Sequence, residues 1–294
     1  MKKLYKIFIF LAVTGLSLSL VFYQVHKQGD LYVYFFDVGQ GDSALIRTPT
    51  HQNILIDGGP DNTLITKLGQ TLPFYDRQID LMVLTHPHDD HLFGLVEVLK
   101  RYKVKQVLST GVLYTTDAYL EWLKLIKEKS IPFKVALSGQ EFDFAESCQN
   151  QTACTSKEVS LKVVYPFSSL ANQSSDNMNQ TSVVTQLQYD KIKILFTGDL
   201  EKAGESEILS HPAIDLQSQV IKIGHHGSQT SSGEEFIKAV KPQFAVISVG
   251  QNNKFGHPAK SVVDRLKSLG IKILRTDQQG DLRLESDGQN LQFD

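Results

Sequence analysis

The stretch Thr85-His86-Pro87-His88-Asp89-Asp90-His91 joins two predicted elements and decides how this sequence is interpreted. It follows the apolar run Ile79–Thr85, which is typical of a strand buried on both faces. It leads into His91–Tyr102, where apolar side chains recur at helical spacing. Three imidazoles and their neighbouring carboxylates are therefore expected where a buried strand ends and a helix begins.

Imidazole and carboxylate groups are ligands that zinc, manganese and iron all accept. On an extended turn His86 and His88 alternate, so both can point to one ion. Asp90 and His91 open the following helix and can point to a second ion. The spacing therefore predicts a site for two divalent metal ions, zinc or manganese.

Three further segments at predicted strand or helix boundaries extend this site. Asp199 follows Gly198 at the end of an apolar strand and is expected to bridge the two ions, or else to cap a helix. His225 and His226 end another strand, so one can ligate while the other meets substrate or an acceptor behind the ligands. His257 precedes a helix, and three roles stay open for it: support of a ligand, contact with a leaving group, or an ordinary loop position.

Strand and helix signals alternate from residue 31 to the end without an internal repeat. They predict one α/β domain over 31–294, with a mixed sheet or two packed sheets and the helices outside. The predicted strands are Leu31–Asp37, Ser43–Thr48, Asn53–Asp57, Ile79–Thr85, Leu161–Tyr165, Val183–Tyr189, Ile192–Thr197, Val220–Ile223, Phe244–Val249, Ile271–Arg275, Asp281–Glu285 and Leu291–Phe293. The predicted helices are His91–Tyr102, Tyr119–Lys129, Leu200–Ser210, Glu234–Val240 and Val262–Leu269, with an insertion over 138–160.

The composition is that of a globular protein, with 41% hydrophobic and 21% charged residues among 294. It excludes a disordered chain and a polytopic membrane protein. Residues 31–294 hold 26 basic and 31 acidic side chains, so no global positive field attracts nucleic acid. Nucleic-acid binding would require a local patch or the metal ions.

Residues 1–30 are predicted to be a membrane anchor or signal segment. Residues 7–25 hold no charge, and as a helix they would nearly span a bilayer core of ~30 Å. Lys2, Lys3 and Lys6 precede them, which places the N-terminus in the cytoplasm. We expect a single-pass cell-membrane protein with an extracellular catalytic domain, or a secreted one if the segment is cleaved.

Cys148 and Cys154 are the two cysteines of the chain and lie in a polar stretch of the predicted insertion. In an exported chain this pattern predicts a local disulfide, with two free thiols as the alternative.

These motifs resemble the metallo-β-lactamase superfamily, and more closely the hydrolase domain of the ComEC-type DNA-uptake proteins of bacterial competence. The resemblance covers residues 31–294. It is carried by His86-x-His88-x-Asp90-His91, Gly198-Asp199 and Lys222-x-x-His225-His226-Gly227-Ser228, and also by Asp37–Ser43, Leu55–Pro60, Leu72–Arg77, Ser182–Val184 and Gly256–Pro258.

The family implies an αββα four-layer sandwich with two metals at the sheet edges. His86, His88, Asp90, His91, Asp199 and one of the two adjacent histidines would be the metal ligands. Two departures matter. The channel of the full uptake proteins is absent from this sequence, and residues 92–198 contain no histidine where the family pattern has a further ligand. Asn177, Asn179 or water would have to replace that ligand.

The leading functional expectation is a metal-dependent phosphodiesterase or nuclease that uses a hydroxide bridging the metals. Asp57 would orient a ligand histidine. Asp90, His226 and His257 are the expected catalytic residues, with His257 or the spare histidine protonating the leaving group. Four basic residues near these motifs could contact substrate phosphates: Lys222, Lys254, Lys260 and Arg265.

Other substrates and one other class of function stay open. A cell-envelope phosphorylcholine-type esterase, acting for example on teichoic acid, shares the motifs, and a β-lactam or lactone is a third choice. The contrasting class is a non-catalytic, metal-containing DNA-binding module of an uptake machine.

Overall fold

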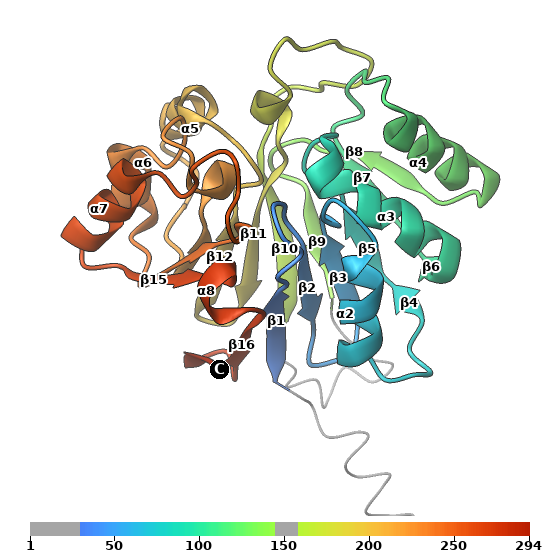
Figure 1. Cartoon of the computed structure of the whole chain (residues 1–294), viewed down its shortest axis with the longest axis horizontal. Coiled ribbons are helices and arrows are strands. Elements are labelled where there is room, and N and C mark those ends of the chain that lie inside the picture. The colour runs from blue at the N-terminus through green and yellow to red at the C-terminus, as the bar shows by residue number, and fades with distance from the viewer. Residues whose placement is uncertain (1–29, 145–157) are drawn as a thin grey trace, which may run out of the picture.

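The computed structural model describes residues 30–144 and 158–294, and these form two packed β-sheets with helices on both outer faces (Figure 1). The first sheet contains, in spatial order, β17 (Leu291–Phe293), β16 (Leu282–Ser286), β1 (Leu31–Phe35), β2 (Ala44–Arg47), β3 (Asn53–Ile56), β5 (Leu81–Val83), β7 (Val107–Ser109) and β8 (Phe133–Val135). The second contains β15 (Lys272–Arg275), β14 (Phe244–Ile247), β13 (Val220–Lys222), β12 (Ile192–Phe196), β11 (Val184–Tyr189), β10 (Val159–Tyr165) and β9 (Glu141–Asp143).

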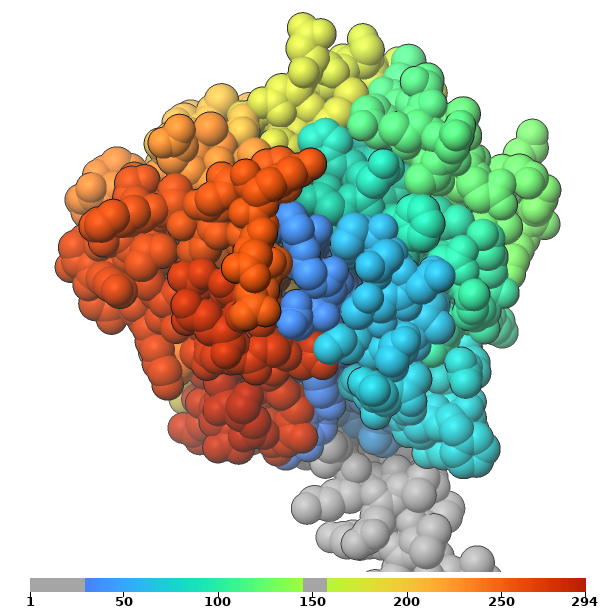
Figure 2. Space-filling view, viewed as in Figure 1, coloured from blue at the N-terminus to red at the C-terminus, as the bar shows by residue number. Residues whose placement is uncertain are grey.

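Helices cover the two outer faces, and smaller elements connect them. The first sheet is covered by α2 (Thr63–Thr71), α3 (Asp89–Arg101) and α4 (Asp117–Glu128), and the second by α5 (Lys202–Leu209), α6 (Glu234–Val240) and α7 (Lys260–Ser268). The remaining elements are the two-stranded sheet β4 (Gln78–Ile79) with β6 (Lys103–Val104), the short helix α8 (Thr276–Gln279), and the 3₁₀ turns Met178–Thr181 and Gly224–Gly227. Figure 2 shows the first described segments, blue to cyan, beside the C-terminal segments, orange to red, on one face.

Strand β1 illustrates how the sequence builds the layers. Leu31, Val33 and Phe35 alternate along the strand and are at most 1% exposed, because they enter the core between the two sheets. Tyr34 points to the opposite side and packs on the core beneath the helices. Since each sheet buries both faces, two further cores lie under the outer helices, and the expected αββα arrangement follows.

Parallel pairing brings several strand ends to one edge of the sandwich. Strand β5 is parallel to β3 and β7 in the first sheet, and β12 is parallel to β13 in the second. The segments that leave β3, β5, β12 and β13 therefore emerge at the same edge. These segments carry the histidines and aspartates that the sequence singled out.

The α/β sandwich that the sequence predicts is confirmed, and the sequence prediction missed several of its elements. Strands β7 and β8 were not predicted, because three residues are too few for a periodic signal. Helix α2 was also missed, although Leu64 and Leu68 lie one turn apart on its buried face. The predicted insertion 138–160 is wrong in part, since β9 and the start of β10 lie inside it.

Two expectations fall on residues outside the described ranges. The membrane span at 7–25 and the disulfide between Cys148 and Cys154 both lie there. Within 30–144 and 158–294, no helix combines the length and the apolar character that crossing a membrane requires.

Candidate metal centre

The turn between β5 and α3 places the first set of polar side chains. His88 has an extended backbone and directly precedes α3, so Asp90 and His91 occupy the first helical turn. Carboxylates are favourable there because exposed N–H groups make a helix N-terminus positive. Glycines hold the helix close to β3, since a Cβ on either Gly58 or Gly94 would collide with the backbone of the other segment. The Gly58 N–H also donates to the carbonyl of His91 at 2.6 Å.

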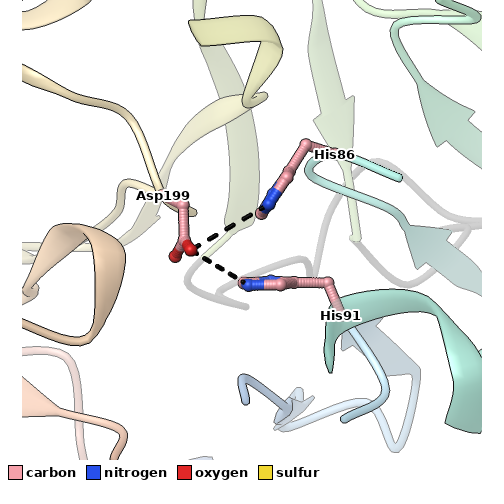
Figure 3. A group of neighbouring side chains, drawn as sticks. All are labelled: His86, His91 and Asp199. Carbon is pink, nitrogen blue, oxygen red and sulfur yellow. Dashed lines mark ion pairs between the residues drawn. The ribbon is translucent and has the colours of Figure 1, made fainter. Parts of the chain in front are cut away.

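Asp199 lies at the middle of the centre, between histidines from both sheets. Its Oδ2 is 3.3 Å from His91 Nε2, 3.5 Å from His226 Nε2 and 4.0 Å from His86 Nε2. Figure 3 shows the His86 and His91 rings directed at this carboxylate. All four residues are buried. Asp199 is therefore placed where two neighbouring ions could share its carboxylate, and the bridging role stays a prediction.

A second group surrounds the same carboxylate. Asp90 Oδ2 is 3.2 Å from His226 Nε2 and 4.0 Å from His91 Nε2. Asp90, His91 and His226 each offer one ligand atom, and these atoms lie within 4.8 Å of one another. His86, His91 and Asp199 form another such group. Two more such groups overlap with these in the described part of the chain: Asp42 with Asp57 and His91, and Asp42 with Asp199 and His226.

The remaining sequence-predicted histidines occupy different places. His88 Nδ1 lies 3.0 Å from His86 Nε2, so these two ring nitrogens converge. His225 turns away from Asp199, and its Nδ1 lies 3.3 Å from both Glu201 Oε1 and Thr230 Oγ1. Of the two adjacent histidines, the structure brings His226 to the centre and leaves His225 outside.

His257 approaches the rim of the centre from the loop before α7. Its ring centroid is 5.6 Å from that of His225 and 6.5 Å from that of His226. Burial lowers the pKa of His257, and the neighbouring histidines lower it further. Its Nδ1 is buried without a hydrogen-bond partner.

Asp57 supports the centre from the end of β3. Its Oδ2 accepts hydrogen bonds from His91 Nδ1 at 2.8 Å and from the Thr85 hydroxyl at 2.7 Å, and its Oδ1 accepts one from the Thr85 N–H at 2.8 Å. These bonds fix the orientation of the His91 ring, which agrees with the role expected for Asp57. Burial would by itself lower the pKa of His91, but the carboxylates of Asp199 and Asp57 raise it well above its usual value.

Asp42 and Lys222 also belong to the centre, and sequence reasoning assigned neither correctly. Asp42 had no role, and Lys222 was interpreted as a cation that could contact substrate phosphate, with an ordinary solvated lysine as the alternative. Both are buried. Lys222 Nζ forms a close ion pair with Asp42, donates to the Gly198 carbonyl at 3.0 Å and lies 3.6 Å from Asp199 Oδ1. Lys222 is thus an internal countercharge, and the expectation that it meets substrate is wrong.

Two of the other basic residues considered as phosphate contacts interact with other parts of the fold. Arg265 donates to the carbonyl of Ser232 at 2.7 Å, and exposed Lys260 pairs with Asp264. Lys254 lies beside the ring of Phe255, 5.2 Å from its centroid.

Two asparagines were considered as replacements for the missing metal ligand. Asn177 donates to Glu201 at 2.7 Å, whereas Asn179 Oδ1 is buried without a hydrogen-bond partner.

The unpaired atoms of the centre fit divalent cations. Asp199 Oδ1, Asp42 Oδ1 and His91 Nε2 are all buried and make no hydrogen bond. Four carboxylates gather here around a single lysine: Asp42, Asp57, Asp90 and Asp199. Buried polar atoms without hydrogen-bond partners are costly, and bound metal ions would satisfy them. The chemistry of these residues suits zinc, manganese or iron.

Comparisons with known proteins agree with this geometry. The family model "Metallo-beta-lactamase superfamily" matches residues 36–149. ComE operon protein 3 of Bacillus subtilis is 30% identical over 270 residues, which are 85% of this chain and 32% of that protein. Competence protein ComA of Neisseria gonorrhoeae is 29% identical over 257 residues, 87% of this chain and 32% of its own length.

The chain thus spans about a third of the length of these relatives. Among solved structures, the diiron β-hydroxylase CmlA of Streptomyces venezuelae has a TM-score of 0.52 and 16% identity. The match covers 88% of this chain and 54% of CmlA, and it shows a likeness of fold. Residues 36–149 thus match the metallo-β-lactamase superfamily, and the chain resembles the hydrolase domain of the ComEC-type competence proteins.

Proposed function

We propose that this chain is a metal-dependent phosphodiesterase that acts outside the cytoplasm, with DNA as the leading substrate. The observation that carries the proposal is the buried Asp199 carboxylate, whose Oδ2 lies within 4.0 Å of the Nε2 atoms of His86, His91 and His226. Asp90, His91 and His226 would hold one ion, and His86 with His88 the other. A bound metal pair activates water for attack and neutralises charge that develops on the substrate.

The other residues orient this centre and handle protons. Asp57 keeps the proton of His91 on Nδ1, so that Nε2 is free to ligate. His257 is proposed to protonate the leaving group. Burial holds its pKa below the usual value, and a phosphodiester anion bound beside it would raise that pKa again. His257 can then donate a proton as the bond to phosphorus breaks.

Aromatic rings beside the centre favour a nucleic acid over a small diester. Phe255 is 58% exposed, and its ring stacks on that of His257 with centroids 5.8 Å apart. Tyr114 lies edge-on to His88 at 6.2 Å. Bases of single-stranded DNA stack on such rings, and Lys254 beside Phe255 adds a positive charge. The similarity to competence proteins points to the same substrate class.

The proposal is tested with the full chain in detergent, reconstituted with Mn²⁺ or Zn²⁺. We expect hydrolysis of bis-(p-nitrophenyl) phosphate and of single-stranded DNA, loss of both on chelation, and loss of both in Asp199→Ala. Phe255→Ala should lower cleavage of DNA and leave the small diester unaffected. An inactive, metal-loaded chain that binds DNA would contradict the proposal and support a non-catalytic module. Selective cleavage of phosphorylcholine esters would identify the envelope esterase instead.

A further inference from the structure

The connection between α2 and β4 exposes two aromatic side chains that the metal centre does not use. Phe74 is 86% and Tyr75 74% exposed, the highest values among the large hydrophobic residues of the described ranges. Their rings meet edge to face, with centroids 5.4 Å apart. Exposed adjacent aromatics are costly in water and are typical of surfaces that bind a partner or a membrane.

Contacts of the next residue locate this aromatic pair at the edge of the sandwich where the described chain begins. Asp76 accepts a hydrogen bond from Asn53 Nδ2 at 3.1 Å and lies 3.6 Å from Arg47 Nη2. Arg47 is paired in the sheet with both Asn53 and Tyr32. Figure 1 shows the α2–β4 connection and the start of β1 at the same end of the molecule.

The metal centre lies at the opposite edge. Strand β3 begins at Asn53 beside the aromatic pair, and four residues later Asp57 contacts His91. Four residues of strand span about 13 Å at ~3.3 Å per residue. The two features therefore face opposite ends of the first sheet.

Positive charge flanks the aromatic pair. Arg77 and Lys103 are exposed, and the Lys103 N–H donates to the Arg77 carbonyl at 2.9 Å where β4 meets β6. Neither side chain forms an ion pair with a described carboxylate, whereas nearby Lys105 is paired with Asp80 at 2.7 Å. Arg77 instead lies over the ring of Tyr102, 5.3 Å from its centroid. Two uncompensated cations beside exposed aromatics suit an anionic lipid surface.

The sequence before β1 limits how far this edge can lie from a membrane. The uncharged stretch 7–25 ends five residues before Asp30, the first described residue. Five residues span at most about 18 Å when fully extended. If 7–25 crosses a bilayer, the edge that carries Phe74 and Tyr75 is held close to the lipid head groups.

We propose that this edge docks on the membrane surface. Phe74 and Tyr75 enter the interface between head groups and acyl chains, and Arg77 and Lys103 meet anionic head groups. Docking turns the metal centre away from the bilayer, toward substrates in the surrounding medium. The inference rests on the expected membrane span and not on the hydrolytic activity.

Depth-dependent quenching tests the docking directly. The full chain is reconstituted into phosphatidylglycerol-containing vesicles with doxyl-labelled lipids, and Phe74→Trp is compared with Phe255→Trp, an exposed aromatic beside the metal centre. The native Trp122 is fully buried and gives the same background in both. We expect blue-shifted, lipid-quenched emission from Phe74→Trp alone. Equal, unquenched emission from both variants, or failure of the chain to float with the vesicles, would overturn the proposal.

A charge variant tests the proposed contact of Arg77 and Lys103 with anionic head groups. Arg77→Gln with Lys103→Gln should reduce quenching of Phe74→Trp in anionic vesicles, while Lys254→Gln with Lys260→Gln should not. Unchanged quenching in the first pair would contradict the head-group contact. Diesterase activity in detergent should be the same for Phe74→Trp and wild type, so failure of docking and failure of the proposed activity give separate results.

Discussion

Replacing Asp57 by Asn tests whether the carboxylate behind His91 controls metal binding. Three donors converge on its two oxygens: the Thr85 N–H, the Thr85 hydroxyl and His91 Nδ1. An amide of the same size offers an oxygen on one side and an NH₂ group on the other. In one orientation the NH₂ group faces the Thr85 N–H, so that two donors oppose each other. The other sets it against His91 Nδ1 and favours the tautomer with the proton on Nε2, the atom that faces Asp199.

The expected loss of metal affinity follows from the lost hydrogen bond between His91 and the Asp57 carboxylate. A hydrogen bond to a charged group contributes about 1.5–3 kcal/mol. Because each ~1.4 kcal/mol corresponds to tenfold in binding, we expect roughly 10- to 100-fold weaker affinity for the ion next to His91. Losses of this size are typical when the partner behind a metal-ligating histidine is removed.

The assay is a competition titration of the metal-free full chain with Mn²⁺ or Zn²⁺ against a chromophoric chelator. Ser43→Ala is the matched control, because the Ser43 hydroxyl donates to the backbone carbonyl of Asp57 at 3.1 Å and does not contact its carboxylate. Ser43→Ala should keep wild-type affinity. Wild-type affinity in Asp57→Asn, together with strong loss in His91→Ala, would refute the reasoning.

Three further predictions concern other parts of the centre and the fold. His226→Ala should lose one bound ion whereas His225→Ala keeps both, because only His226 contacts Asp90 and Asp199; metal analysis distinguishes the two. Gly69→Ala should stabilise α2 by about 0.5–1 kcal/mol since its Cβ meets open space, whereas Gly94→Ala should destabilise the fold in denaturant titrations and displace α3 from β3. Burial raises the pKa of Glu205 to about 7, so the folded chain binds more protons than the unfolded chain between pH 4.5 and 7. Stability should therefore fall as pH rises through this range, and a melting-temperature profile of Glu205→Gln should be flatter there.

The sequence was most informative where chemistry and periodicity coincide. The apolar run before Thr85, the helical spacing after His91 and the glycine before Asp199 predicted the strand ends that meet at the centre, and the structure brings these segments together. Short elements such as β7 and β8 carry no such signal, because three residues show no period and their strand conformation comes from pairing with neighbouring strands.

Side-chain direction at the centre could not be predicted from one-dimensional spacing. His225 and His226 both have left-handed backbone conformations, and this local turn sends one ring to Asp199 and the other to Glu201. Lys222 appeared to be a surface cation because lysine is rarely buried. Its role as partner of Asp42 depends on a contact between residues 180 positions apart, although Asp42 itself stands in a motif that the family resemblance had singled out.

The number of bound metal ions tests the account most directly. The full chain is reconstituted with Mn²⁺ or Zn²⁺, freed of loosely held ions and measured by elemental analysis. The arrangement of His86, His91 and His226 around Asp199 predicts two ions per chain, and Asp199→Ala should weaken both. Less than one ion per wild-type chain would contradict the account.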